Sequence, residues 1–385
     1  MSCRNIVVLG ATGSIGQSAS RVARELSGRV RIVGMSGFRN IDRLAAEANS
    51  LRPDALAVPD AAAEVELRAK LDYKPVAIFT GPGGLEQLAT WEGADMVLVA
   101  IVGTGGLRPT FAALEAGKDI ALASKEVLVV AGELVMSAAR RSGRRIFPVD
   151  SEHNAIFQCL DGRDPVQVRR LILTASGGPF RDWPEDKMRA VTRQEALRHP
   201  TWRMGEKITI DSATMFNKGL EMIEARWLFD VDIARIDVVI HPQSIVHSMV
   251  EFVDGSVLAQ MSHSDMRFPI QYALTWPDRI AGSLPPLDWA RLARLDFEEP
   301  RYDVFPALEL ARQAARRGGA APAVLNAANE VAVAEFLAGR IAFPRIWQIV
   351  AAVLGKCGHR PGGDLETLLA SDLEARGLAL AEARS

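Results

Sequence analysis

The side chains best suited to catalysis form an acidic segment, Asp150-Ser151-Glu152-His153-Asn154, which follows a predicted strand over residues 145–149. Because side chains alternate along a strand, Asp150 and Glu152 are expected to project together from its carboxyl end, where open α/β sheets collect their ligands. Two adjacent carboxylates repel each other unless a cation or proton lies between them, and hard oxygen donors favour Mg²⁺ or Mn²⁺. The segment indicates a metal site, but such a pair is also common at a solvated strand end.

A third candidate carboxylate, Glu221, lies further along the chain. Asp211 or Ser212 is expected to cap the start of the helix that carries it. Asn217 and Glu221 are four residues apart and share one face of that helix, with Lys218 beside them. This face either contributes Glu221 to a metal site or is an exposed face on which Lys218 pairs with the acid.

A glycine-rich segment, Thr174 to Phe180, follows another predicted strand and contains Ser176. Its hydroxyl and exposed amides suit a phosphate group, although a simple turn explains the segment equally well. Downstream, His199-Pro200-Thr201-Trp202-Arg203-Met204-Gly205 has the composition of a loop with an aromatic side chain between proline and glycine. Such a loop can close over a ligand and exclude water, whereas a lone tryptophan more often packs into a core.

The first predicted strand leads into Gly10-Ala11-Thr12-Gly13-Ser14-Ile15-Gly16 and then a helix. Strand, glycine loop and helix N-terminus together form an anion site, because free N–H groups and the helix dipole face a pyrophosphate. The spacing is G-x-x-G-x-x-G, and the alternative is a purely structural tight turn. After the second strand, Gly37-Phe38-Arg39-Asn40 supplies an arginine and no acid, which favours a 2′-phosphate and hence NADPH. The alternative for Arg39 is an exposed loop residue.

Strands alternating with helices across the first 149 residues predict a Rossmann-like, doubly wound parallel sheet that positions these loops. Residues 150–276 are expected to form an α+β catalytic and connective domain. In it, residues 245–252 and 257–261 form an antiparallel hairpin around the Asp254-Gly255 turn. A proline-rich linker over 277–306 and a helical domain over 307–385 complete the chain.

The composition excludes several classes of protein. Lys plus Arg total 45 against 47 for Asp plus Glu, and the net charge of -2 gives no basic footprint for nucleic acid or anionic lipid. The longest apolar run, residues 96–102, is far shorter than the ~20 residues of a membrane span, and we expect it to form a buried strand. Three scattered cysteines and a first strand without a signal-peptide pattern lead us to expect a cytoplasmic protein.

The motifs together resemble the 1-deoxy-D-xylulose 5-phosphate reductoisomerase family over nearly the whole chain. The matching runs are GATGSIGQS, LASKE, PVDSEHNAIFQ, ASGGPF, HPTWRMGEKITIDSATMFNKGLEMIEARWLF, HPQSIVHSMVEF, DGSVLAQ and LNAANE. PVDSEHNAIFQ and the NKGLE segment are highly specific. The resemblance implies a homodimer that converts a small phosphorylated keto sugar with NADPH and Mg²⁺, Mn²⁺ or Co²⁺, by rearrangement followed by reduction, in non-mevalonate isoprenoid synthesis.

The resemblance also implies roles for single residues. The expected metal ligands are Asp150, Glu152 and Glu221. The expected substrate contacts are Ser151, Glu152, Ser176, His199, Ser212, Asn217, Lys218 and Glu221. The expected catalytic residues are Lys125, Glu152, His153, His199 and Trp202, with Trp202 and Met204 on a mobile lid. The expected cofactor contacts are Thr12, Gly13, Ser14, Ile15, Gly37, Arg39, Asn40, Ser124, Glu126 and Gly205.

Three departures from the family pattern affect expected affinities rather than the reaction. Ser124 stands where the family has asparagine, and Thr201 and Arg203 replace asparagine and serine in the lid. The loop at residues 37–40 is one residue longer than in the family. Two rival functions are a metal-free reductase of the semialdehyde dehydrogenase type, which would need Cys159 as nucleophile, and a non-catalytic NADPH sensor. A sensor would have no use for three grouped carboxylates.

Overall fold

The computed structural model describes residues 3–202 and 204–385, and they group into two compact units. Unit 1 comprises the described residues up to Val127 together with Val135–Asn154 and Asp265–Pro286. Unit 2 comprises Leu128–Leu134, Ala155–Ser264 and Leu287–Ser385. The four domain ranges expected from the sequence remain a prediction.

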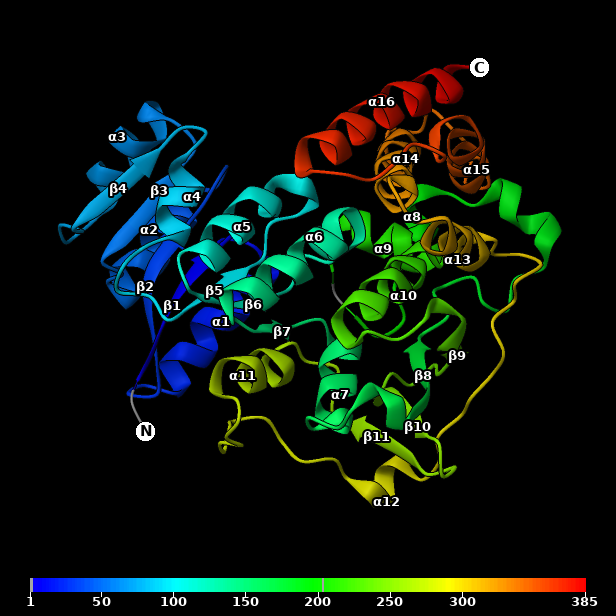
Figure 1. Ribbon diagram of the computed structural model, residues 1–385, viewed down its shortest axis with the longest axis horizontal. Helices are drawn as coiled ribbons and strands as arrows, with labels where there is room; N and C mark the ends of the chain where they lie inside the picture. Colours follow the sequence, from blue (N-terminus) through cyan, green and yellow to red (C-terminus); the bar gives the residue numbers. More distant parts are fainter. Residues whose placement is uncertain (1–2, 203) are drawn as a thin grey trace. The chain divides into compact units, whose positions relative to one another are not determined.

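Unit 1 contains a parallel sheet of seven strands in the order β4-β3-β2-β1-β5-β6-β7 (Figure 1). The strands are β1 Arg4–Leu9, β2 Val30–Ser36, β3 Ala55–Val58, β4 Ala77–Thr80, β5 Met96–Val99, β6 Asp119–Leu122 and β7 Ile146–Pro148. β1 and β5 are short apolar strands whose central side chains are fully buried, as expected when helices cover both faces. The strand order reverses between β1 and β5, and at such a switch point loops diverge and leave room for a ligand. The predicted doubly wound sheet is confirmed.

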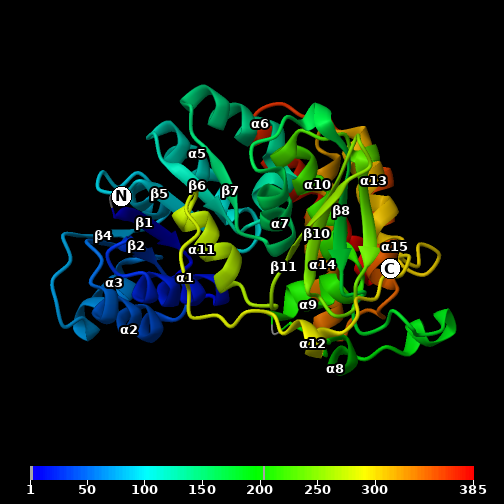
Figure 2. The ribbon, with the colours of Figure 1, turned by 90° about the horizontal axis from the view of Figure 1, so that it is seen from below.

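Helices cover this sheet, with α5 on one face and α1, α2 and α11 on the other (Figure 2), and α4 packs against α5. The helices that lie wholly in unit 1 are α1 Ser14–Glu25, α2 Ile41–Leu51, α3 Ala61–Lys70, α4 Gly84–Ala89, α5 Leu107–Glu115 and α11 Arg267–Thr275. Two further helices, α6 Glu126–Ser142 and α7 Ser151–Leu160, have residues in both units. A short 3₁₀ turn, η1 Gly103–Gly106, precedes α5. Helix α1 is strongly amphipathic, and its buried side includes Ala19, Val22 and Ala23.

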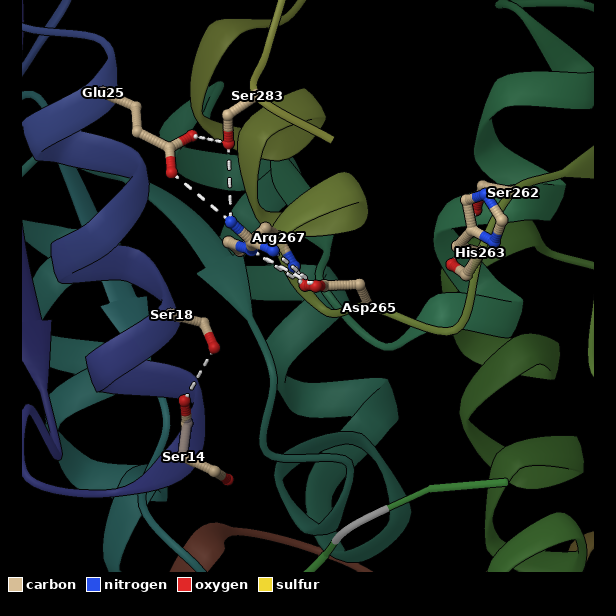
Figure 3. A network of polar contacts seen from close by, with 8 residues as sticks. All are labelled: Ser14, Ser18, Glu25, Ser262, His263, Asp265, Arg267 and Ser283. Carbon is tan, nitrogen blue, oxygen red and sulfur yellow. Dashed lines mark hydrogen bonds and ion pairs between the residues drawn. The ribbon is translucent and has the colours of Figure 1, made fainter. Parts of the chain in front are cut away.

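The segment 265–286 is fastened to α1 although it lies far away in sequence (Figure 3). Arg267 binds Asp265 at 2.8 Å and reaches Glu25, at the end of α1, at 3.4 Å. Ser283 donates a hydrogen bond of 2.8 Å to the other oxygen of Glu25. Burial alone would raise the pKa of Asp265, but hydrogen bonds and charge from Arg267 lower it overall. Charged contacts thus hold both ends of the segment on one helix end.

Unit 2 contains a four-stranded sheet in the order β11-β10-β8-β9. The strands are β8 Val168–Ala175, β9 Ile236–Ile240, β10 Val246–Phe252 and β11 Val257–Met261. β8 and β9 are parallel, whereas β10 runs antiparallel to both β8 and β11. The predicted hairpin is confirmed, and Gly255 allows its turn by adopting φ +85°.

The helices of unit 2 enclose one large apolar core with the sheet. They are α8 Arg193–Ala196, α9 Glu206–Ala213, α10 Phe216–Phe229, α12 Trp289–Leu292, α13 Ala307–Arg317, α14 Ala321–Leu337, α15 Arg345–Cys357 and α16 Leu365–Arg384. Three short 3₁₀ turns are η2 Pro165–Gln167, η3 Glu185–Ala190 and η4 Ile233–Arg235. Helices α14, α15 and α16 pack against one another, which confirms the predicted helical C-terminal region (Figure 1). Of the described helices, none combines the length and apolar character that crossing a bilayer requires.

Several predicted elements were wrong in detail. The strand expected over residues 96–102 ends at Val99, because the chain turns at the switch point and enters η1. Asp211 and Ser212 do not cap the helix that carries Glu221. They lie inside α9, and a new helix, α10, begins after Met215 adopts φ +66°.

Candidate active site

The glycine loop between β1 and α1 has the geometry of a dinucleotide-binding turn. Gly10 has φ +89°, and a Cβ there would lie 2.4 Å from the carbonyl oxygen of Ala100, which follows β5. A Cβ on Gly16 would lie 2.4 Å from the carbonyl oxygen of Gly10. Both positions therefore require glycine for packing. Gly13 and Ser14 are exposed, and no side chain caps α1, so its first amides can bind an anion.

The loop after β2 lies against the glycine loop. Ser36 accepts a hydrogen bond of 2.9 Å from the Gly10 amide through its hydroxyl. Arg39 is exposed, and its guanidinium lies 5.8 Å from the ring centre of the exposed Phe38. Asn40 has a structural task as well, because its side chain caps α2 by accepting from the Arg43 amide at 2.9 Å. The loop leaves a cationic side chain beside the nucleotide turn.

Ser124 and Lys125 connect β6 to α6 at the same edge of the sheet. The Ser124 hydroxyl donates a 2.6 Å hydrogen bond to the carbonyl of Ile101, beyond the end of β5. Lys125 is nearly buried and its Nζ lies 2.6 Å from Oδ2 of Asp150. Glu126 is buried in the first turn of α6. Ser124 thus makes a contact within the protein at the position where the family pattern has the longer side chain of asparagine.

The acidic segment is placed differently from the strand end that the sequence suggested. β7 stops at Pro148 and α7 begins at Ser151, so Asp150 precedes the helix and Glu152 lies in its first turn. Asp150 and Glu152 therefore do not project from a strand by side-chain alternation as expected. Helix geometry instead places Glu152 beside Ser151, whose hydroxyl donates to Glu152 at 2.5 Å. His153 is fully buried, and its Nδ1 lies 4.0 Å from Asp150 Oδ2.

In unit 2, His199 lies between two serines from different segments. Its Nε2 lies 3.1 Å from Ser176 Oγ and 3.0 Å from Ser212 Oγ. Its Nδ1 accepts the backbone amides of Thr201 and Trp202 at 3.2 and 2.9 Å. With Nδ1 accepting, a neutral ring carries its proton on Nε2 and presents it between the two hydroxyls. Together these groups form a cluster of hydrogen-bonding side chains suited to an anion.

Backbone packing shapes this cluster. Gly177 and Gly178 follow β8 with φ values of +82° and +69°. A Cβ on Gly178 would lie 2.9 Å from the carbonyl oxygen of Ser212, so the glycine turn packs directly on the end of α9.

Helix α10 contributes a second polar group. Glu221 is fully buried, and it accepts a 2.5 Å hydrogen bond from Asn217 on the preceding turn. Lys218, also buried, forms an ion pair with the other oxygen of Glu221. The alternative that the sequence allowed, an exposed face on which Lys218 pairs with Glu221, is right about the ion pair but wrong about the exposure, because both side chains are buried.

The predicted lid carries Trp202, whose ring centre lies 6.3 Å from that of His247 on β10. Met204 is partly exposed, and Gly205 is the N-cap of α9. Arg203 lies outside the described residues. Sequence reasoning assigned no role to Ser244, whose hydroxyl lies 3.2 Å from Thr201 Oγ1 and so connects the lid to the loop after β9. Only the HPQS motif pointed to that loop.

Fold and site define a class, the dinucleotide-dependent oxidoreductases that act on an anionic substrate. The sequence profile of 1-deoxy-D-xylulose 5-phosphate reductoisomerase matches residues 6–132, and two profiles of its C-terminal domains match residues 146–229 and 261–378. The chain belongs to the 1-deoxy-D-xylulose 5-phosphate reductoisomerase family.

Individual relatives agree with this assignment. The reductoisomerase of Symbiobacterium thermophilum is 53% identical over 381 residues, 98% of either chain, and that of Pseudomonas putida is 50% identical over 98% of this chain and 96% of its own. The Zymomonas mobilis enzyme, solved in complex with NADPH, has a TM-score of 0.94, 44% identity and full coverage of both chains. A reductoisomerase solved with NADPH, fosmidomycin and magnesium has a TM-score of 0.93 and 43% identity, covering 99% of this chain and 98% of its own.

Proposed function

We propose that this protein isomerises and reduces 1-deoxy-D-xylulose 5-phosphate to 2-C-methyl-D-erythritol 4-phosphate with NADPH and one divalent cation. The observation that carries the proposal is the 43% identity, over 99% of this chain, to a reductoisomerase that binds NADPH, fosmidomycin and magnesium. When bound, the cation polarises the substrate carbonyl and NADPH supplies the hydride.

Unit 1 would hold NADPH. The exposed, uncapped N-terminus of α1 and the glycines packed behind it fit a pyrophosphate, and Arg39 fits the 2′-phosphate. The full set of proposed contacts is Thr12, Gly13, Ser14, Ile15, Gly37, Arg39, Asn40, Ser124, Glu126 and Gly205. Because Arg39 is exposed and has no acid beside it in this loop, the site would prefer NADPH over NADH.

Asp150, Glu152 and Glu221 would ligate the cation. The donor chemistry fits, because all three offer carboxylate oxygens, the ligands that Mg²⁺ prefers. Asp150 and Glu221 each have a lysine ammonium as partner within their own unit, and the cation would take over part of that charge compensation when it binds. Mn²⁺ and Co²⁺ would serve the same ligands.

The substrate phosphate would lie against the cluster around His199. Ser176, Ser212 and His199 would donate hydrogen bonds to it, with Asn217 and Lys218 completing the set. At the reacting end, Ser151 and Glu152 would orient the sugar, while Lys125 and His153 would hold charge and protons beside it. Trp202 would cover the bound substrate and exclude water.

The two rival functions are less well supported. Cys159 is buried on α7, with 7% of its surface exposed, which is unsuited to a nucleophile that must reach a substrate. A sensor that only binds NADPH would not need the buried ion pair between Lys218 and Glu221. Stoichiometric conversion separates these functions: NADPH absorbance should fall when 1-deoxy-D-xylulose 5-phosphate is added, and mass spectrometry and NMR should identify methylerythritol phosphate. NADPH binding without product formation would favour the sensor.

A homodimer is part of the proposal. β11 is an edge strand of its sheet, and Val257 and Leu258 on it are 49% and 42% exposed. An exposed apolar edge strand is a surface that natural proteins usually cover. Sedimentation should give twice the chain mass, whereas Leu258→Lys should shift the protein toward monomer. We further propose that the enzyme works in the cytoplasm, and its distribution in fractionated cells would test this.

A further inference from the structure

Two helices of unit 2 meet at a buried polar contact that the proposed site does not use. Asn329 on α14 is fully buried, and its Nδ2 donates a 2.8 Å hydrogen bond to Oδ1 of Asp211 on α9. The other oxygen of Asp211 lies 2.6 Å from Lys207 Nζ, one helical turn earlier. Both oxygens of this buried carboxylate are thereby engaged.

The position of Asp211 makes this contact important for anion binding. Asp211 directly precedes Ser212, whose hydroxyl lies 3.0 Å from His199 in the proposed phosphate cluster. A negative charge beside a phosphate site opposes binding unless it is neutralised and turned away. Lys207 supplies the neutralising charge, and the Asn329 amide fixes the orientation of the carboxylate and, with it, the last turn of α9.

The other contacts of Asn329 support a dedicated role. Its Oδ1 is buried and has no hydrogen-bond partner among the described residues. Burying an asparagine costs free energy that a leucine of similar size would avoid. The bond to Asp211 is therefore the polar contact that accounts for an amide at this position.

We propose that Asn329 is a positioning residue for the phosphate end of the substrate, acting through Asp211 on Ser212. This inference rests on the proposed function, because it takes the cluster around His199 as the phosphate site. It assigns to α14, which contributes no proposed ligand, the task of holding the phosphate cluster in its binding geometry.

A matched control lies one turn away on the same helix. Asn326 is also fully buried and also has an Oδ1 without a partner in the described chain, but its Nδ2 donates to Glu330 at 3.0 Å rather than to Asp211. Replacing Asn326 tests what the loss of a buried amide from α14 does by itself.

The experiment compares Asn329→Leu and Asn329→Asp with Asn326→Leu and Asn326→Asp. The first readout is the thermal stabilisation of the metal-free protein by inorganic phosphate, measured against chloride at equal ionic strength. The second is the KM for 1-deoxy-D-xylulose 5-phosphate, set against kcat and the Kd for NADPH. Asn329→Ser replaces Asn329→Leu if the leucine variant does not fold.

We expect both Asn329 variants to bind phosphate about tenfold more weakly and to show a KM about tenfold higher, equivalent to ~1.4 kcal/mol, with NADPH affinity unchanged. The Asn326 variants should lose thermal stability but keep the response to phosphate. Equal phosphate responses in wild type and the Asn329 variants would overturn the inference while leaving the proposed function intact. A wild-type protein that neither responds to phosphate nor converts the substrate would overturn the proposed function and this inference with it.

Discussion

Lys218 and Glu221 form an ion pair in which the two side chains are 4% and 0% exposed. Such a pair is retained at the cost of desolvating both charges, and replacing it by apolar residues often leaves stability unchanged. Its presence is explained if Lys218 serves an anionic substrate and Glu221 serves a cation. The pair then keeps each residue charged until its ligand binds.

The role of Glu221 as a ligand is tested by Glu221→Gln. The amide removes one formal negative charge from the cation site, and we expect the metal concentration for half-maximal activity to rise at least about tenfold. NADPH affinity, measured by fluorescence, should stay unchanged. Glu206→Gln is the matched control, because Glu206 is exposed on α9 and pairs with Arg193. Normal turnover of Glu221→Gln at limiting metal would contradict the assignment.

The nucleotide turn is tested by Gly13→Ala. A Cβ at Gly13 would meet its nearest atom, the Gly10 carbonyl oxygen, at 3.4 Å, so the fold should tolerate it. The added methyl lies at the exposed helix start, where it should hinder the pyrophosphate and weaken NADPH binding about tenfold. Gly355→Ala in α15 has open space around it and serves as control. Unchanged NADPH affinity in Gly13→Ala would place the cofactor elsewhere.

Cofactor preference is tested by Arg39→Gln. Loss of the guanidinium should reduce kcat/KM for NADPH about tenfold while leaving that for NADH nearly unchanged, because only NADPH carries the 2′-phosphate. Arg43→Gln removes a neighbouring exposed arginine that binds Gln17 instead, and it should keep the wild-type preference. A preference that survives Arg39→Gln would assign recognition of the 2′-phosphate to another residue.

The lid is tested by Trp202→Ala. Removing the indole should raise KM and lower kcat together, because closure both retains the substrate and excludes water. Trp289→Ala, which truncates a tryptophan that is 65% exposed, should change neither. Kinetic constants of Trp202→Ala equal to those of wild type would show that Trp202 only packs against its neighbours.

The anchor of segment 265–286 has a predicted pH dependence. Since Arg267 lowers the folded-state pKa of Asp265, this carboxylate stabilises the fold above its unfolded pKa of about 3.9, and the contribution is lost as pH falls. Arg267→Leu should therefore destabilise the protein at neutral pH, and the difference from wild type should shrink in acid. Urea denaturation of both proteins, at neutral pH and in acid, measures this difference in the free energy of unfolding. A difference that stays constant or grows in acid would contradict the pairing.

Much of unit 1 could be predicted because periodicity and loop chemistry agree there. Glycines after β1 and an alternation of strands and helices define the parallel sheet without tertiary information. β4, α4 and α5 were not predicted. β4 is a partly exposed edge strand without a strong apolar run. α5 follows a glycine-rich 3₁₀ turn, so the sequence carries no clear signal for the start of this helix.

The site was less predictable than the fold. Sequence spacing predicted that Asp150 and Glu152 project together from the end of a strand. The strand instead ends at Pro148 and a helix begins at Ser151, and a two-residue pattern cannot show that change. Nor can spacing show that Met215 separates two helices, since a methionine, unlike a glycine, gives no sign of the left-handed conformation that it adopts there. His199 contacts both Ser176 and Ser212, which lie on segments far apart in the sequence, and only the folded structure shows that these segments meet.

The most direct test of the account follows NADPH absorbance after 1-deoxy-D-xylulose 5-phosphate is added to fully chelated enzyme, and again after Mg²⁺ is restored. The account predicts no oxidation of NADPH in the chelated sample and full, substrate-dependent oxidation once the cation returns. Oxidation that continues at an undiminished rate under complete chelation would contradict it.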